Sequence, residues 1–233
     1  MIYVCVDDTD SLNSRGTGRL ARAIAAKLSK KYPVEGVTRH QLYVHPDIPF
    51  TSHNSCAVIH LNTDNKKNMD NIFEIAKEEI YNDFIEGSDP GLSVAHESQI
   101  KPSLIAYAKD AKDTVLTQKK ARKLAENLNI RLEGLGGTED GVIGSMAGLG
   151  LAYMGNDGRF LLKDNIRNLL GSQFVEKLIE AGIDAIYTLD GRLVTKGIIH
   201  NNADKSVKPC PVNGKCILFV DDSKGVFQAI KRN

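Results

Sequence analysis

Three aspartates that follow the first apolar run of the chain are the residues best suited to do chemistry. Asp7, Asp8 and Asp10 lie within four positions, directly after the run at residues 2–6. Carboxylates this close repel one another when ionised, so a site that gathers them needs a cation or raised pKa values. Mg²⁺ fits such a site, because it binds a few carboxylates, water and phosphate oxygens. All three converge only if the chain turns at Thr9; the alternative is an acidic turn that caps nearby amides.

A short glycine loop, Gly16-Thr17-Gly18, stands just before a helical pattern. The start of a helix presents backbone amides and the positive end of its dipole to an anion, and Arg15 or Arg19 can add a charge-assisted contact. The loop therefore indicates a phosphate site. An ordinary glycine turn at the start of a helix is the alternative.

A second helix-entry loop reads Gly136-Gly137-Thr138-Glu139-Asp140. It offers the same kind of anion-binding backbone. Its two acidic residues either stabilise the start of the helix through the helix dipole, or hold a second metal or a ribose hydroxyl. Neither loop matches Gly-x4-Gly-Lys-Ser/Thr or the Gly-x-Gly-x-x-Gly fingerprint. A P-loop or Rossmann domain is therefore disfavoured.

Polar residues between two predicted strands are candidates for substrate binding. The segment holds Arg39, His45, His53 and Asn54, and loops between strands often receive ligands. A lone histidine is nevertheless usually structural, so both interpretations stay open.

The composition is that of an ordinary globular protein. Thirty Lys and Arg stand against 29 Asp and Glu, for a net charge of +1, so the chain has no overall basic field that would indicate nucleic acid. The four cysteines form no C-x-x-C, which gives little support for structural zinc. Without a signal peptide or a long apolar run, we expect a cytoplasmic protein with no membrane segment. The sequence leaves the oligomeric state open.

The elements that must position these residues alternate between strands and helices. Apolar runs and periodicities predict strands at 2–6, 34–45, 55–61 and 92–95, and helices at 17–32, 67–83, 102–111, 117–128, 141–152, 163–170 and 172–181. The segment 212–215 predicts a two-residue hairpin turn. These patterns indicate an α/β (α+β) fold, a compact two-layer body with an antiparallel or mixed sheet.

Taken together, the motifs resemble the archaeal tRNA agmatinylcytidine (agmatidine) synthetase family, TiaS. The matching segments keep the family's order and spacing over roughly residues 2 to 225, and they are residues 6–11, 39–50, 54–58, 89–92 and 137–144. The resemblance implies a kinase-like domain that binds ATP and Mg²⁺, cleaves ATP to AMP and pyrophosphate, and activates a tRNA cytidine for attack by agmatine. It suggests a kinase-like nucleotide-binding domain at 1–59 and 116–233, and a ferredoxin-like part at 60–115.

The chain departs from the family's pattern at two places. The family has Met-Cys-Thr-Thr, whose second Thr is phosphorylated, where this chain has Arg15-Gly16-Thr17-Gly18, so Thr17 is the hydroxyl that remains. The OB-fold and zinc ribbon that hold tRNA in the family do not appear either, so we expect tRNA binding to need a partner chain.

Residues and resemblance together give one set of candidate site residues. They are catalytic Asp8 and Thr17; nucleotide-binding Thr9, Ser11, Gly16, Gly18, Arg19, Gly136, Gly137, Thr138, Glu139 and Asp140; substrate-binding Arg39, His45, His53 and Asn54; and metal-binding Asp7, Asp8 and Asp10. The leading hypothesis is an Mg²⁺- and ATP-dependent enzyme that transfers phosphate or nucleotidyl to a small-molecule or RNA acceptor. The alternatives are tRNA-cytidine modification with a partner chain, and a regulatory module that binds a nucleotide without turnover.

Overall fold

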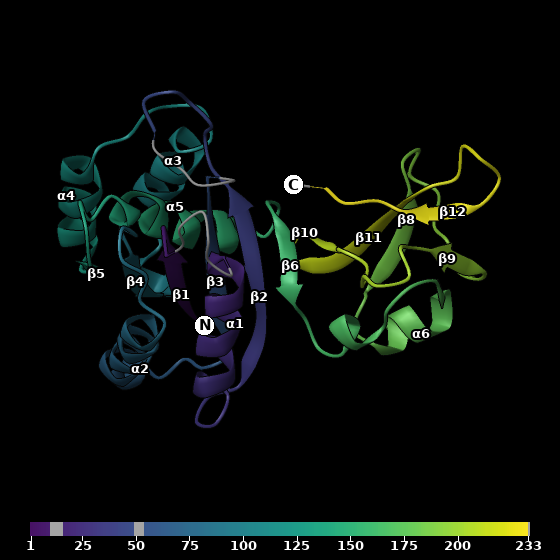
Figure 1. Ribbon diagram of the computed structural model, residues 1–233, viewed down its shortest axis with the longest axis horizontal. Helices are drawn as coiled ribbons and strands as arrows, with labels where there is room; N and C mark the ends of the chain where they lie inside the picture. The colour runs from purple at the N-terminus through teal and green to yellow at the C-terminus, as the bar shows by residue number, and fades with distance from the viewer. Residues whose placement is uncertain (10–15, 49–53, 233) are drawn as a thin grey trace. The chain divides into compact units, whose positions relative to one another are not determined.

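The computed structural model describes residues 1–9, 16–48 and 54–232. Two compact units divide the chain, Met1–Met154 and Gly155–Asn233 (Figure 1). Residues 1–59, 60–115 and 116–154 all lie in the first unit. The division into kinase-like and ferredoxin-like domains stays a prediction.

The first unit is built around an antiparallel sheet. Its strands follow the order β5-β4-β1-β3-β2, with β1 paired to both β3 and β4. The elements are β1 (Ile2–Asp7), α1 (Thr17–Leu28), β2 (Val34–Gln41), β3 (Ser55–Leu61), η1 (Lys66–Asn68), α2 (Met69–Asn82), β4 (Gly91–His96), η2 (Glu97–Gln99), α3 (Pro102–Asp110), α4 (Gln118–Leu128), β5 (Arg131–Gly134) and α5 (Gly141–Met154).

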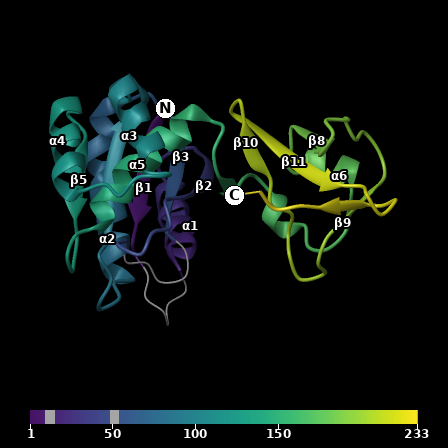
Figure 2. The same ribbon diagram turned by 90° about the horizontal axis from the view of Figure 1, so that it is seen from above.

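Helices cover both faces of this sheet, so every residue of β1 is buried. Tyr3 and Cys5 belong to the core formed with α3, α4 and α5, whereas α1 and α2 lie against the opposite face (Figure 2). The predicted α/β class is confirmed, and the structure adds a helical layer to the two layers expected. A five-residue apolar run with no polar alternation is the pattern of a strand covered on both sides.

The glycine-rich helix α5 approaches the sheet closely. A Cβ placed on Gly148 would lie 2.4 Å from the Cys5 Sγ and 2.7 Å from the Cys56 Sγ, and one on Gly150 would lie 2.6 Å from the Ala108 Cβ. Each glycine lowers helix propensity by about 1 kcal/mol relative to alanine. Close packing against β1, β3 and α3 offsets this cost.

Most predicted elements of the first unit are present, with small shifts at their ends. The Thr117 side chain caps α4 by accepting the Lys120 N–H. Gly16, with φ 83°, takes the N-cap position of α1, and Thr17 is its first helical residue.

The second unit has a mixed sheet. Its strands run β10-β11-β12-β9-β7, with β8 parallel to β11, and its core includes Ile186, Leu218 and Val220. The elements are β6 (Arg159–Leu162), η3 (Ile166–Asn168), β7 (Gln173–Phe174), α6 (Val175–Glu180), β8 (Ala185–Thr188), β9 (Ile198–His200), β10 (Cys210–Val212), β11 (Lys215–Asp221) and β12 (Phe227–Ala229).

Two helix predictions in the second unit are partly wrong. Only the short η3 forms within 163–170, because Asp164 (φ 40°) and Gly171 (φ 70°) adopt left-handed backbone at either end. The helix predicted at 172–181 shortens to α6, because Phe174 pairs with Ile198 of β9 instead. The predicted hairpin turn is confirmed, with Asn213 at φ 49° before its glycine.

In the described parts of the chain, no helix has both the length and the apolar character needed to cross a membrane.

Candidate functional site

Asp7 ends β1 with its carboxylate turned toward helix α5. The residue is only 7% exposed, and a Cβ on Gly144 would lie 1.8 Å from the Asp7 Oδ2. Alternation along β1 puts Asp7 on the same face as Tyr3 and Cys5. The first turns of α5 therefore receive a buried carboxylate, and only a glycine at 144 leaves room for it.

Tyr107 of α3 bonds to the first turn of α5, the helix that receives the Asp7 carboxylate. Its hydroxyl donates to the Ile143 carbonyl oxygen at 3.1 Å. Burial, and to a smaller extent the charge of Asp7, raises the pKa of Tyr107 well above its usual range. Tyr107 therefore stays a neutral hydrogen-bond donor that fixes the start of α5.

Asp8 and Thr9 continue from the strand end with unusual backbone and side-chain environments. Asp8 has φ 51°, a left-handed conformation that is uncommon outside glycine. Thr9 is 5% exposed, and its hydroxyl has no hydrogen-bond partner among the described residues. A buried polar atom without a partner is costly in a folded protein. An absent ligand is one explanation for it.

Asp89 connects this strand end to the second glycine loop. Its N–H donates to the Asp8 carbonyl at 3.1 Å, and its own carbonyl accepts the Gly141 N–H at 3.0 Å. Its side-chain Oδ1 accepts the Thr138 N–H. The segments around residues 8, 89 and 138–141 therefore form one hydrogen-bonded unit.

The second glycine loop is also held from its outer side by α4. Gln118 Nε2 donates to the Thr138 carbonyl and to the Asp140 Oδ1, each at 2.7 Å, and Arg122 pairs with Glu139. Glu139 has φ 66°, a left-handed conformation like that of Asp8. Strained backbone of this kind is typical of functional sites.

Several amides of this loop are already used within the protein. Thr138 and Gly141 donate to Asp89, and Glu139 donates to the Gly136 carbonyl at 3.1 Å. The predicted contact of residues 136–140 with a nucleotide remains a prediction. What the structure adds is an anion from the protein itself, the Asp89 carboxylate.

The first glycine loop forms the start of α1. Thr17 is 8% exposed, the Arg19 side chain is exposed, and the Arg19 N–H donates to the Gly16 carbonyl at 2.9 Å. Gly18 is half-buried in the first turn. Asp10 and Ser11, which complete the predicted acidic motif, lie outside the described residues.

The predicted substrate residues lie near the end of β2, in the loop that follows it and directly before β3. Arg39 Nε donates to the Ser55 Oγ at 2.9 Å, and Asn54 Nδ2 donates to the Tyr43 carbonyl at 2.6 Å. His45 stacks on the Tyr43 ring and lies 3.6 Å from the Asp47 carboxylate. These contacts give all three residues structural roles, and their substrate role stays a prediction.

His53 lies outside the described residues. Leu42, in the same segment as Arg39 and His45, reaches the Asp7 site, because a Cβ on Gly144 would lie 2.7 Å from the Leu42 Cδ1.

Sequence reasoning did not select Asp89, Gln118 or Arg122. Asp89 stands in a Gly-Ser-Asp-Pro-Gly stretch that reads as an ordinary turn, and Gln118 and Arg122 lie on a helix face that reads as solvated. Only tertiary contacts reveal these residues. The one available signal was the match of residues 89–92 to the TiaS pattern.

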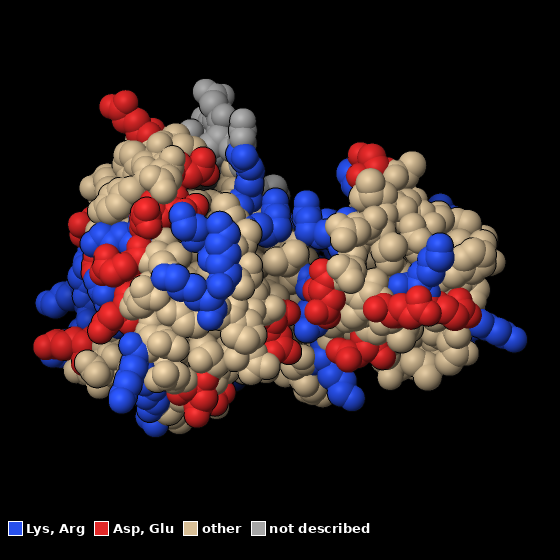
Figure 3. Space-filling view, turned by 90° about the horizontal axis from the view of Figure 1, so that it is seen from below, with Lys and Arg blue, Asp and Glu red and all other residues tan. Residues whose placement is uncertain are grey.

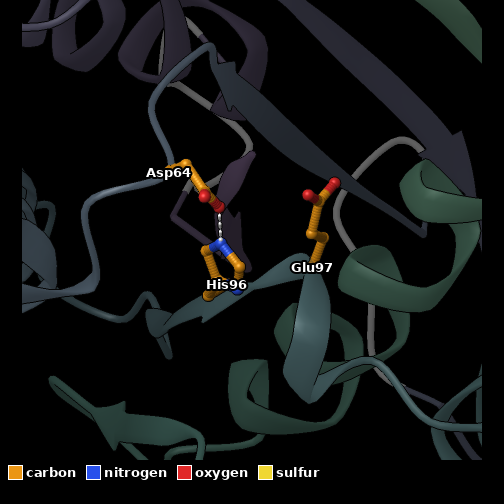
Figure 4. Close-up of side chains that lie close together, drawn as sticks. All are labelled: Asp64, His96 and Glu97. Atoms are coloured by element: carbon orange, nitrogen blue, oxygen red, sulfur yellow. Dashed lines mark hydrogen bonds and ion pairs between the residues drawn. The ribbon is translucent and has the colours of Figure 1, made fainter.

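A second polar cluster, Asp64, His96 and Glu97, lies at the other end of β1. His96 is opposite Ile2, whereas Asp7 is opposite Gly91. The imidazole points at Asp64 (Figure 4). The sequence offered no partner for His96, and the structure supplies Asp64.

The hydrogen bonds of His96 indicate which ring nitrogen carries the proton. Nδ1 accepts the Ser98 N–H at 3.1 Å, so Nε2 carries the proton and donates to Asp64. A metal would need the lone pair of Nε2 instead. The hydrogen bond from His96 lowers the pKa of Asp64.

Charges of both signs are interspersed over the face of each unit drawn in Figure 3. This agrees with the near-zero net charge and with the ion pairs of α4, such as Lys120 with Asp110 at 3.1 Å. The basic face of α4 is therefore partly neutralised.

Fold and site together define an α/β protein in which an acidic strand end meets a glycine loop at the start of a helix. Among solved structures, this architecture is similar to that of TiaS, the tRNAIle2 agmatidine synthetase. The apo structure matches with a TM-score of 0.54 and 22% identity over 64% of this chain and 35% of that one. The TiaS–tRNA(Ile2)–ATP complex matches with the same TM-score and identity, over 64% and 36%.

The match to the TiaS–tRNA(Ile2)–AMPCPP–agmatine complex extends over 88% of this chain and 51% of that one, with a TM-score of 0.54 and 17% identity. The chain thus spans about a third to a half of the length of the TiaS structures. The resemblance expected from the motifs is confirmed at the level of the fold. No protein-family model matches the sequence, and the comparison with curated proteins found no match.

Proposed function

We propose that this chain is an Mg²⁺- and ATP-dependent enzyme that transfers a phosphoryl or nucleotidyl group to an acceptor. The observation that carries the proposal is the meeting of Asp7, Asp8 and Thr9 with the start of α5, through the hydrogen bonds of Asp89. Two independent features fit bound Mg²⁺ and nucleotide. One is the carboxylate oxygens at the strand end, and the other is the buried Thr9 hydroxyl, which has no hydrogen-bond partner within the described part of the chain.

Asp7 and Asp8 would hold the metal, with Asp10 as a third candidate from outside the described residues. Hard oxygen donors of this type are what Mg²⁺ prefers, and one or two protein carboxylates suffice when phosphates and water complete the shell. Bound Mg²⁺ would neutralise phosphate charge and orient the leaving group.

The protein's own groups would bind and position the nucleotide. Thr9 would donate its hydroxyl, and residues 16–18 at the start of α1 would face the phosphates together with Arg19. Residues 136–140 would contact the nucleotide from the start of α5. Positioning and charge stabilisation provide most of the rate in phosphoryl transfer. Thr17 is the candidate hydroxyl for a transient phosphoryl acceptor.

A second candidate function is modification of a tRNA cytidine with help from a partner chain. The observation that favours it is the fold similarity to TiaS, whose structures include complexes with tRNA(Ile2). In a gel-shift assay with purified tRNA, this function predicts salt-sensitive binding once the partner is added. A small-molecule enzyme predicts no such binding.

The nucleotide product tests the proposal. The protein is incubated with Mg²⁺ and ATP labelled at the α- or the γ-phosphate, and the products are separated. AMP with pyrophosphate supports nucleotidyl transfer, and ADP supports phosphoryl transfer. In this mixture water and the Thr17 hydroxyl are the available acceptors. ATP binding with neither free nucleotide product nor label on the protein would contradict the enzyme and favour a regulatory module.

A further inference from the structure

We infer that Asp89 is a positioning residue. It fixes the second glycine loop in place relative to the metal-binding strand end. The inference rests on the proposed function for the role of the two segments, but its geometry is independent of it. Asp89 makes hydrogen bonds both to Asp8 and to the loop at 138–141.

The carboxylate of Asp89 lies in a space that only glycine leaves open. A Cβ on Gly137 would lie 1.9 Å from the Asp89 Oδ1, and Gly137 has φ 55°. A Cβ on Gly91 would lie 2.0 Å from the Gly141 carbonyl carbon. The 89–91 segment therefore lies directly against the glycine loop. The Asp89 carboxylate occupies the position at which the amides of such a loop would otherwise bind an external anion.

The two segments that Asp89 joins contain strained residues. Asp8 (φ 51°) and Glu139 (φ 66°) are both non-glycine residues with left-handed backbone. Asp89 bonds to the carbonyl of Asp8 itself, and to the amides of Thr138 and Gly141 on either side of Glu139. Such conformations persist only when the surroundings over-determine them, and Asp89 supplies that constraint to both.

Gln118 provides the matched comparison. It holds the same loop from helix α4, through the Thr138 carbonyl and Asp140. Removing Gln118 should loosen the glycine loop alone. Removing the Asp89 carboxylate breaks its bond to the Thr138 N–H and leaves the main-chain bonds of Asp89 to Asp8 and Gly141 in place. The loop around Thr138 should then lose its alignment with the segment that is bonded to Asp8.

The test compares Asp89→Ala, Asp89→Asn and Gln118→Ala with the wild type, and with Asp83→Ala as a control at an exposed aspartate. The dissociation constant of ATP is measured by calorimetry with and without Mg²⁺. The ratio of the two values reports how well metal and phosphate sites are aligned. Hydrogen exchange of the Thr138 amide is measured on the same proteins without nucleotide.

We expect Asp89→Ala to reduce the Mg²⁺ enhancement of ATP binding by about tenfold, the effect of losing one charge-assisted hydrogen bond, and to speed exchange of the Thr138 amide. Asp89→Asn keeps an acceptor oxygen, so its Mg²⁺ enhancement of ATP binding and its Thr138 exchange rate should both stay close to those of the wild type. Gln118→Ala should weaken ATP binding equally with and without Mg²⁺, which leaves the ratio unchanged.

An unchanged ratio and an unchanged Thr138 exchange rate in Asp89→Ala would overturn the inference. A wild-type protein that binds no ATP would refute the proposed function instead. In that case the Thr138 exchange rate still decides whether Asp89 holds the loop. Circular dichroism and thermal unfolding check that each variant is folded.

Discussion

The glycine at position 144 gives the sharpest test of whether the Asp7 carboxylate matters for function rather than for packing. In Gly144→Ala the new Cβ would lie 1.8 Å from the Asp7 Oδ2, and ordinary contact begins near 3.4 Å. The carboxylate and the helix must therefore separate by about 1.6 Å. A displacement of about 1 Å at a reacting group costs roughly a hundredfold in rate. We expect ATP turnover to fall by at least that factor.

The stability change should be modest. Overpacking a core costs about 1–3 kcal/mol, and replacing glycine by alanine in a helix returns about 1 kcal/mol. The net loss of unfolding free energy is then about 0–2 kcal/mol, so the protein stays folded. Urea unfolding followed by circular dichroism measures it.

Gly148→Ala is the matched control, one turn further along α5. Its Cβ would lie 2.4 Å from the Cys5 Sγ and 2.7 Å from the Cys56 Sγ, so it overpacks the same interface without touching Asp7. We expect a similar loss of stability and nearly unchanged turnover. The reasoning is refuted if Gly144→Ala keeps its activity, or if both variants lose it equally.

Three further substitutions probe other parts of the molecule. Asp8→Asn should abolish Mg²⁺-dependent ATP turnover while the melting temperature stays close to that of the wild type. The control Asp113→Asn, at an exposed aspartate, should change neither turnover nor melting temperature. An active Asp8→Asn enzyme would show that Asp8 does not belong to the site. Thr9→Val removes a buried hydroxyl that has no partner among residues 1–9, 16–48 and 54–232, so the unfolding free energy should stay equal or rise by about 1 kcal/mol while ATP affinity falls. Unchanged affinity in calorimetry would argue against a ligand at Thr9. The hydrogen bond from His96 lowers the pKa of Asp64 in the folded state, so its stabilising effect is present above the unfolded pKa near 3.9 and is lost as pH falls through the lowered value. Melting temperatures measured from pH 6 downward should therefore fall less steeply in Asp64→Asn, and parallel curves would contradict this linkage.

The parts of the fold that were predictable from the sequence are those set by local patterns. A strand was predicted at 2–6 and a helix at 141–152, and the structure has β1 and α5 at these positions. The hairpin turn at 212–215 followed from its Asn-Gly pair. In each case the side chains of a short segment dictate its structure.

The parts that were missed depend on partners far away in the sequence. Asp89 looks like a turn residue until the fold brings Asp8 and Thr138 to it. Phe174 joins a strand because Ile198 lies opposite, whereas its own segment favours a helix. The sequence was enough to place the acidic motif at a strand end. It could not show that the Asp7 carboxylate lies against α5.

The most direct test of the central claim is calorimetric titration of the wild-type protein with ATP in the presence of Mg²⁺. Our account predicts saturable binding of one ATP per chain that weakens when Mg²⁺ is removed with a chelator and is lost in Asp8→Asn. Absence of binding to the folded wild-type protein, or binding that neither the chelator nor Asp8→Asn changes, would contradict it.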